Sequence, residues 1–156
     1  MRIAGEPLCG RSGHEAGREL LARLYRETAG ETLPEIAVAD RGKPYFVSEN
    51  LHFSISHTKN HVFCALSDRP VGLDAEEMDR DVNLRLAEKI LSPSETVRWE
   101  ASADRRAALL RLWVLKEAAV KLSGEGLKGF PNDTDFDPED PQIMELDGCY
   151  VAVFVE

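Results

Sequence analysis

Residues 51–76 read LHFSISHTKNHVFCALSDRPVGLDAE, and this stretch decides the fold. Leu51, Phe53 and Ile55 alternate with polar residues, which is the period-two pattern of a half-buried strand with these three side chains inward. Two further apolar runs follow, and a Ser-Asp-Arg-Pro turn separates them. We therefore predict a meander of three strands, at residues 51–56, 62–66 and 71–75.

Helices are predicted on both sides of these strands. Upstream, residues 14–28 carry leucines at helical spacing before Gly30. Downstream, Ser92-Pro93-Ser94-Glu95 has the form of a capped helix start, and the helix runs to about Ala101. A longer helix begins after Asp104 and runs through Leu122, where glycines follow. Shorter features are a strand at 36–39, a turn at 41–44 and a closing strand at 151–155.

Composition limits both the architecture and the partners. With 156 residues and 43% hydrophobic content, the chain can bury one core, or two small lobes that share one. Its apolar runs are far shorter than the roughly 20 residues that cross a bilayer, and no secretory segment follows Met1, so we expect a cytoplasmic protein. The net charge of −9 disfavours nucleic acid and acidic membranes. The three cysteines lack metal-ligand spacing, and Cys64 and Cys149 lie in apolar, strand-like surroundings, so we expect buried thiols.

Two carboxylates are expected to converge at the end of the third strand. In Gly72-Leu73-Asp74-Ala75-Glu76, strand geometry puts Asp74 and Glu76 on the same face. Mg²⁺ prefers such oxygen ligands together with substrate phosphate and water. The alternative is a solvated acidic strand end.

The long helix carries a second charged set. Helical spacing puts an apolar face (Leu115, Ala118, Ala119 and Leu122) toward the core. Lys116 and Glu117 are expected on the opposite side with Lys121 at its edge, which is a set suited to a metal and a phosphate. The alternative is an ordinary amphipathic helix in which Glu117 and Lys121 form an ion pair.

Other motifs are weaker. The sequence Ser54-Ile55-Ser56-His57 lacks the glycine-flanked serine of a nucleophile elbow, which disfavours a serine hydrolase. The glycines of residues 124–129 follow a helix instead of opening one, so helix termination is favoured over phosphate binding.

Four segments between residues 42 and 127 occur together in a fixed order. They are Gly42-Lys43-Pro44, Phe53-Ser54-Ile55-Ser56-His57, Gly72-Leu73-Asp74-Ala75-Glu76, and Trp113 to Lys121 followed by Gly124-Glu125-Gly126-Leu127. Together they resemble the 4′-phosphopantetheinyl transferases, and their order and spacing are similar to the Sfp-like, surfactin-synthetase-activating branch.

The resemblance implies an enzyme of the holo-[acyl-carrier-protein] synthase type. Such enzymes transfer the phosphopantetheine arm of coenzyme A to a serine of an acyl or peptidyl carrier protein and release adenosine 3′,5′-bisphosphate. Asp74, Glu76 and Glu117 are expected to hold Mg²⁺, or Mn²⁺ in its place, against the coenzyme A pyrophosphate. Glu117 is also the expected base for the serine, and Lys116 and Lys121 are expected beside the pyrophosphate.

The resemblance also implies an α+β fold of two similar lobes, which we expect at residues 1–70 and 71–156. Because few residues precede Gly42, we expect the first lobe to be reduced and to lack opening strands. Lys43, Ser56 and His57 are expected to hold coenzyme A, with His57 near its 3′-phosphate, and Arg11 and Arg18 are further candidates. Self-association would cover apolar surface that the short lobe leaves exposed.

Two alternatives stay open at this point. A noncatalytic module would bind coenzyme A or a carrier protein without turnover. A metal-dependent phosphohydrolase would use the same carboxylates on coenzyme A without a carrier.

Overall fold

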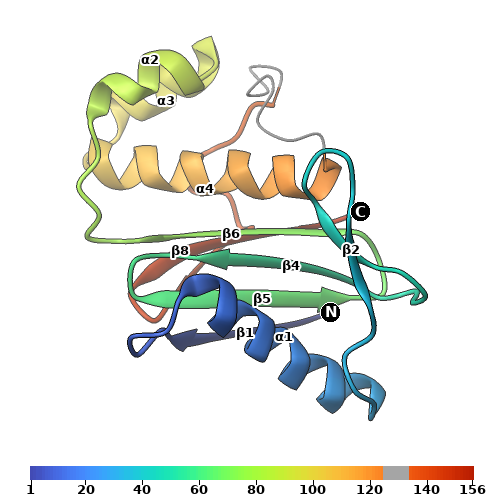
Figure 1. The fold of residues 1–156 in the computed structure, drawn as a ribbon. Coiled ribbons are helices and arrows are strands. Elements are labelled where there is room, and N and C mark those ends of the chain that lie inside the picture. Colours follow the sequence, from blue (N-terminus) through green and yellow to red (C-terminus); the bar gives the residue numbers. More distant parts are fainter. Residues whose placement is uncertain (125–133) are drawn as a thin grey trace.

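The computed structural model describes residues 1–124 and 134–156 and shows an α+β fold (Figure 1). A three-stranded antiparallel sheet in the order β1-β5-β4 comes from the first part of the chain, and a second in the order β6-β8-β7 comes from the rest. Their strands are β1 (Arg2–Pro7), β4 (His52–His57), β5 (His61–Ser67), β6 (Val71–Glu77), β7 (Ile143–Leu146) and β8 (Cys149–Val155).

The two sheets share one topology. In each, a first strand leads into a long helix and then into an antiparallel hairpin, whose last strand pairs with the first strand. The helices are α1 (Gly13–Ala29) and α4 (Arg105–Ser123). The predicted fold of two similar lobes is therefore confirmed, whereas the division at residues 70 and 71 stays a prediction.

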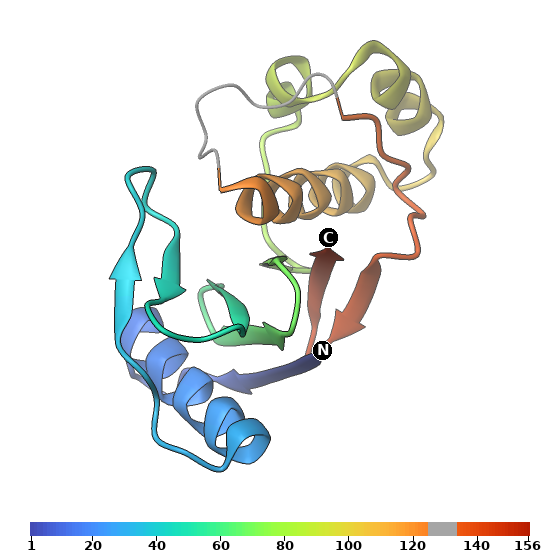
Figure 2. The ribbon, with the colours of Figure 1, turned by 90° about the vertical axis from the view of Figure 1, so that its right-hand side faces the viewer.

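Alternating side chains stack these elements in layers. Val62, Cys64 and Leu66 of β5 pack toward α1, while Phe63 and Ala65 point the other way. The latter meet Leu73 and Ala75 of β6 and Val151 and Val153 of β8 in a core between the sheets. The opposite face of the second sheet packs on α4. Figure 2 shows α4 above the second sheet and α1 against the first.

Three shorter elements complete the cover. The hairpin of β2 (Ile36–Val38) and β3 (Pro44–Phe46) extends from the first lobe toward the end of α4 (Figure 2). The 3₁₀ turn η1 (Leu84–Leu86), α2 (Ala87–Ile90) and α3 (Pro93–Ala101) lie over α4 on the side away from the sheets (Figure 1). A capping box at Ser92 and Glu95 starts α3, as predicted.

Two predictions about the strands are wrong. The third strand of the expected meander, β6, pairs with β8, because both edges of β5 are already filled by β1 and β4. The first lobe also has an opening strand, β1, which the sequence did not suggest because its Gly5, Glu6 and Pro7 break the apolar alternation. The ring of Phe63 packs where a side chain on Gly5 would lie, so the glycine is required for this pairing.

Candidate active site

Asp74 lies at the centre of the site. It faces away from the core between the sheets, because Leu73 and Ala75 on either side of it face that core. The side chain is buried, and its Oδ1 accepts hydrogen bonds from Ser56 Oγ at 2.8 Å and from Lys121 Nζ at 2.7 Å. Strand β4 of the first lobe and helix α4 of the second thus meet at one carboxylate.

Glu117 approaches from α4 because the helix lies directly on β6. A Cβ on Gly72 would be 2.2 Å from the carbonyl oxygen of Ala118 and 2.3 Å from the amide nitrogen of Leu122. Only glycine therefore permits this packing, in which the predicted apolar face around Ala118 is turned to the sheet. Glu117 and Lys121, one turn apart, project beside the strand that carries Asp74.

The carboxylates of the site repel one another. Burial raises the pKa of Glu117 to about 7, with a further rise from the charges of Asp74 and Glu76, while Lys121 opposes the shift. Burial also raises the pKa of Glu76. The charge of Asp74 raises this pKa further, and the nearby Arg80 guanidinium offsets only part of the rise. A cation placed among these groups would relieve the repulsion.

The oxygen donors of Asp74, Glu76 and Glu117 fit a hard divalent cation such as Mg²⁺ in type and charge. Lys121 neutralises Asp74, and Arg80 forms an ion pair with Glu76. Within residues 1–124 and 134–156, the three carboxylates do not form a group whose ligand atoms all lie within 4.8 Å of one another.

A cleft of about 370 Å³ opens next to Glu117 and Lys121. The β2–β3 turn, with Gly42 and Lys43, forms part of its wall, and Ser54 and Ile55 of β4 form another part. Lys43 Nζ donates a hydrogen bond to the carbonyl oxygen of Leu122 at 2.7 Å, and partial burial lowers the pKa of this lysine. Lys43 therefore ties the first lobe to the end of α4 at the rim of the cleft.

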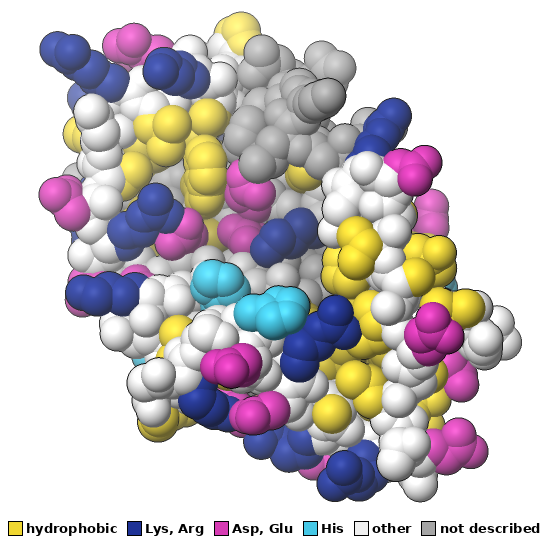
Figure 3. Space-filling model, viewed as in Figure 1, with side chains coloured by type: hydrophobic (Ala, Val, Ile, Leu, Met, Phe, Trp, Pro, Cys, Tyr) yellow, Lys and Arg dark blue, Asp and Glu magenta, His cyan; other side chains and the backbone are white. Residues whose placement is uncertain are grey.

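A second cleft, of about 320 Å³, carries basic groups of the first lobe. His14 and Arg18 from α1 and His57 from β4 line it, and its wall shares Gly42, Pro44, Phe53 and Ile55 with the first cleft. In Figure 3 two histidines lie side by side on this face, with Lys or Arg side chains near them and carboxylates above them. The two clefts form one groove, in which Glu117 lines one end together with Lys43 and Lys121, and His14, Arg18 and His57 line the other.

Lys116 does not reach this groove, which corrects its predicted position. Its side chain is fully buried, 2.8 Å from a carboxylate oxygen of Glu95 that is also fully buried. The prediction assumed that one side of α4 faces solvent. Instead α2 and α3 cover that side, where Leu109 and Leu112 occupy the same helical stripe as Lys116.

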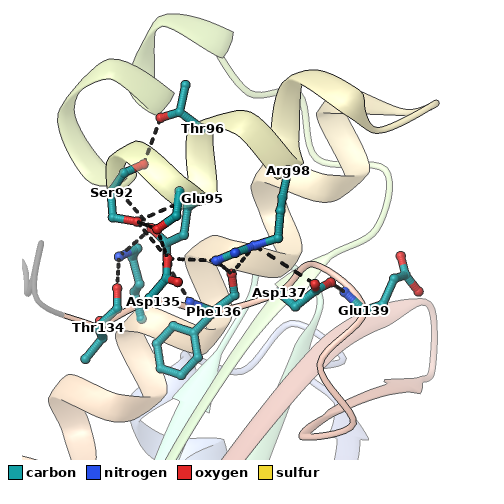
Figure 4. Close-up of polar contacts among 11 residues, drawn as sticks. Ser92, Glu95, Thr96, Arg98, Thr134, Asp135, Phe136, Asp137 and Glu139 are labelled. Carbon is teal, nitrogen blue, oxygen red and sulfur yellow. Dashed lines mark hydrogen bonds and ion pairs between the residues drawn. The ribbon is translucent and has the colours of Figure 1, made fainter.

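The buried pair connects three segments of the second lobe (Figure 4). Glu95 accepts hydrogen bonds from the backbone nitrogens of Ser92 at 2.8 Å and Phe136 at 2.9 Å. Lys116 Nζ donates to the carbonyl oxygen of Thr134 at 3.2 Å. Lys116 thus links Thr134 to the helix that carries Glu117.

The remaining predicted residues lie in different places. The Ser56 hydroxyl is buried and donates to Asp74, so it positions a carboxylate. Arg18 and His57 line the basic end of the groove. Arg11 does not, because its guanidinium forms ion pairs with Glu6 and Glu19. Of the glycines in residues 124–129, Gly124 ends α4 with a φ of 69°, and the others fall outside the described residues.

Comparison with known proteins supports this picture. The family model of the 4′-phosphopantetheinyl transferase superfamily matches residues 70–147, which is half of the chain and includes β6, α4 and β7. The chain belongs to this superfamily. The resemblance of the sequence motifs is confirmed.

Several superfamily members share part of the sequence. The 4′-phosphopantetheinyl transferase gsp of Aneurinibacillus migulanus is 34% identical over 88 residues, which are 55% of this chain and 36% of that protein. Psf-1 of Bacillus pumilus is 32% identical over 127 residues, or 80% of this chain and 50% of that protein. Sfp of Bacillus subtilis is 26% identical over 113 residues, or 70% and 49%. This chain thus spans about a third to a half of these transferases.

The structure adds site residues that the motifs missed. Arg80, four residues after Glu76, pairs with it, and an acid–base spacing of four was the available signal. His14 joins His57 in the groove because Gly13 lets the start of α1 pack on the His57 ring, where a Cβ would lie 2.4 Å from the ring.

No helix among the described residues has the length and apolar character needed to span a bilayer.

Proposed function

We propose that this superfamily member transfers 4′-phosphopantetheine from coenzyme A to a serine hydroxyl of an acyl or peptidyl carrier protein. One observation carries the proposal: Glu117 and Lys121 line one end of a groove next to Asp74 and Glu76, and the other end is lined by His14, Arg18 and His57. Coenzyme A has a pyrophosphate and a separate 3′-phosphate, and the groove offers a site for each.

The carboxylates are assigned to the pyrophosphate end. Asp74, Glu76 and Glu117 would hold Mg²⁺, which when bound neutralises charge on the pyrophosphate and polarises its reacting phosphoryl group. Lys121 is close enough to Asp74 to move between this carboxylate and a phosphate oxygen. Its charge would stabilise the negative charge that develops on the leaving phosphate.

Glu117 is assigned as the base. In the transfer, the serine oxygen bonds to the phosphorus that carries the pantetheine arm, and the bond from that phosphorus to the bridging oxygen breaks. The serine proton passes to Glu117, directly or through water, and adenosine 3′,5′-bisphosphate departs. A carboxyl whose pKa is near 7 is suited to accept a proton at neutral pH.

His14, Arg18 and His57 are assigned to the 3′-phosphate of coenzyme A, since guanidinium and imidazole groups donate hydrogen bonds to phosphate oxygens. Lys43 would adjoin the arm between the two ends of the groove. Lys116 has a positioning role, because its ammonium is buried under α3 and does not face the groove.

Transfer is tested by mass spectrometry. The chain, coenzyme A and Mg²⁺ are mixed with several purified acyl and peptidyl carrier proteins, and the carrier is expected to gain the mass of the phosphopantetheine arm. The same mixture with a chelator is the control and is expected to give no gain. Coenzyme A binding by calorimetry without any mass gain would instead support a noncatalytic module, and phosphate release without a carrier would support a phosphohydrolase.

A further inference from the structure

A cluster with mixed chemistry lies outside the groove, where the two lobes meet. His61 begins β5, Glu77 ends β6, and Cys149 begins β8. One ligand atom from each, an imidazole nitrogen, a carboxylate oxygen and a thiol sulfur, lies within 4.8 Å of the other two. Among the described residues this is the one such set of three.

Strand alternation explains why these side chains meet. Phe63 and Ala65 of β5 and Leu73 and Ala75 of β6 face the core between the sheets, and His61 and Glu77 continue the same two rows. Cys149 is itself part of that core and pairs directly with Glu77 in the ladder of β6 and β8. The cluster is therefore the end of the core between the lobes.

The distance between His61 and Glu77 matches that between two ligands of a tetrahedral metal better than that of a hydrogen bond, and the Cys149 sulfur lies at hydrogen-bond distance from the same nitrogen. The Nδ1 atom of His61 is 3.5 Å from Oε1 of Glu77 and 3.8 Å from Sγ of Cys149. A nitrogen-to-oxygen hydrogen bond is usually about 2.7–3.2 Å long. Zinc bond lengths of about 2.0–2.3 Å at tetrahedral angles place neighbouring ligand atoms roughly 3.4–3.6 Å apart.

The surroundings supply the other parts of a metal site. Glu77 Oε1 accepts hydrogen bonds from Thr58 Oγ1 at 2.6 Å and from the Asn60 backbone nitrogen at 2.9 Å, which fixes the carboxylate. Glu77 also lines a cleft of about 660 Å³ that gives access from solvent. His61 and Glu77 keep 21% and 13% of their side chains exposed, which leaves room for water as a fourth ligand.

We infer that His61, Glu77 and Cys149 form a second metal site, which takes a thiophilic divalent cation of the Zn²⁺ type and joins the two lobes. A thiolate, an imidazole and a carboxylate are the ligands that Zn²⁺ accepts in three-residue sites. Mg²⁺ does not favour sulfur, so this site differs in chemistry from the carboxylates of the groove. Strand alternation also points Glu77 away from the side that Asp74 and Glu76 share.

Cobalt is a direct probe of this site, because a thiolate bound to Co²⁺ absorbs in the near ultraviolet. The chain is stripped of metal with a chelator, exchanged into buffer and titrated with Co²⁺. We expect the thiolate band to saturate at one equivalent and to disappear when Zn²⁺ is added. Cys149→Ser should abolish the band. Cys9→Ser removes an exposed thiol and should leave the band unchanged.

Further variants test whether loss of the thiolate band in Cys149→Ser could come from misfolding or from metal binding in the groove. His61→Gln, at the rim of the cluster, should weaken Co²⁺ binding at least about tenfold. Even the loss of a residue that only hydrogen-bonds to a metal ligand typically lowers metal affinity by about that factor. His52→Gln changes an exposed histidine and should have no effect. Asp74→Ala should keep the band, so this test is independent of the proposed transfer activity. Absence of a thiolate band in the parent chain, or its persistence in Cys149→Ser, overturns the inference.

Discussion

The ammonium of Lys116 lies 2.8 Å from the carboxylate of Glu95, and neither side chain is exposed to solvent. The adjacent residue, Glu117, points into the groove. A helix that is buried on two sides thus holds a structural lysine and a candidate catalytic carboxylate next to each other in sequence. The buried pair orients α4 without contacting the groove.

Lys116→Met is expected to destabilise the fold by about 3–5 kcal/mol, because it leaves the charge of Glu95 buried without its partner. Urea unfolding monitored by circular dichroism measures the change. Lys89→Met, which changes an exposed lysine of α2, is the control and should cost much less. Equal stability of the Lys116→Met and parent proteins would contradict the structural role of Lys116.

Asp74→Asn is expected to lower kcat/KM for carrier modification at least about a hundredfold, or ~2.7 kcal/mol of transition-state free energy. The amide removes a negative ligand but keeps the size of the side chain. Carrier modification is followed by mass spectrometry at saturating Mg²⁺. Asp68→Asn, in an exposed turn, is the matched control. Full activity of Asp74→Asn would refute the assigned metal-binding role.

The raised pKa of Glu117 predicts a pH dependence of stability in metal-free protein. Between the unfolded pKa of about 4.5 and the folded pKa of about 7, the folded state binds more protons at this residue. Its contribution to the free energy of unfolding is therefore fully present below the unfolded pKa of about 4.5 and is lost as the pH rises through the folded pKa of about 7.

Glu117→Gln removes this contribution. Urea unfolding in the presence of a chelator, from pH 5 to pH 8, should show the parent chain losing stability relative to Glu117→Gln. The difference between the two proteins isolates Glu117 from other titrating groups. Parallel curves over this range would show that the pKa of Glu117 is not raised.

Gly72→Ala is expected to displace α4, since the new methyl group would overlap the backbone of Ala118 and Leu122. Overpacking of this kind typically costs about 1–3 kcal/mol. Carrier modification should also fall, because α4 carries Glu117 and Lys121. Gly148 has a φ of 74°, and no atom lies within 4 Å of the position of an added Cβ. Gly148→Ala should therefore strain the backbone and lower stability without lowering carrier modification. The structure would be wrong about this contact if Gly72→Ala were silent in both measurements.

His57→Ala is expected to raise KM for coenzyme A more than it lowers kcat, because His57 is assigned to the 3′-phosphate. The comparison substrate is 3′-dephospho-coenzyme A, for which the parent and the variant should have similar KM values. His52→Ala, at the other end of the same strand, is the control, because His52 lines neither of the two clefts. An equal rise in KM for both substrates would place His57 elsewhere on the ligand.

Local patterns predicted most of the elements and the carboxylate pair. The alternation around Phe53 and the capping box at Ser92 depend on neighbouring residues, which is why the sequence showed them. The pairing of β6 with β8 and the burial of Lys116 depend on segments distant in the chain. The spacing of apolar residues along α4 could not show that α2 and α3 cover one side of this helix. The cluster of His61, Glu77 and Cys149 was missed for the same reason, since its ligands come from three separate strands.

The common topology of the two lobes has a consequence for how a ligand binds. The carboxylates come from β6 and α4 of the second lobe, whereas His14, Arg18 and His57 come from the first. The groove therefore pairs a carboxylate with lysines at one end and carries basic groups at the other. If the carboxylates hold a cation as proposed, a ligand with a pyrophosphate and a separate phosphate would bind in one direction, with its pyrophosphate at the Glu117 end.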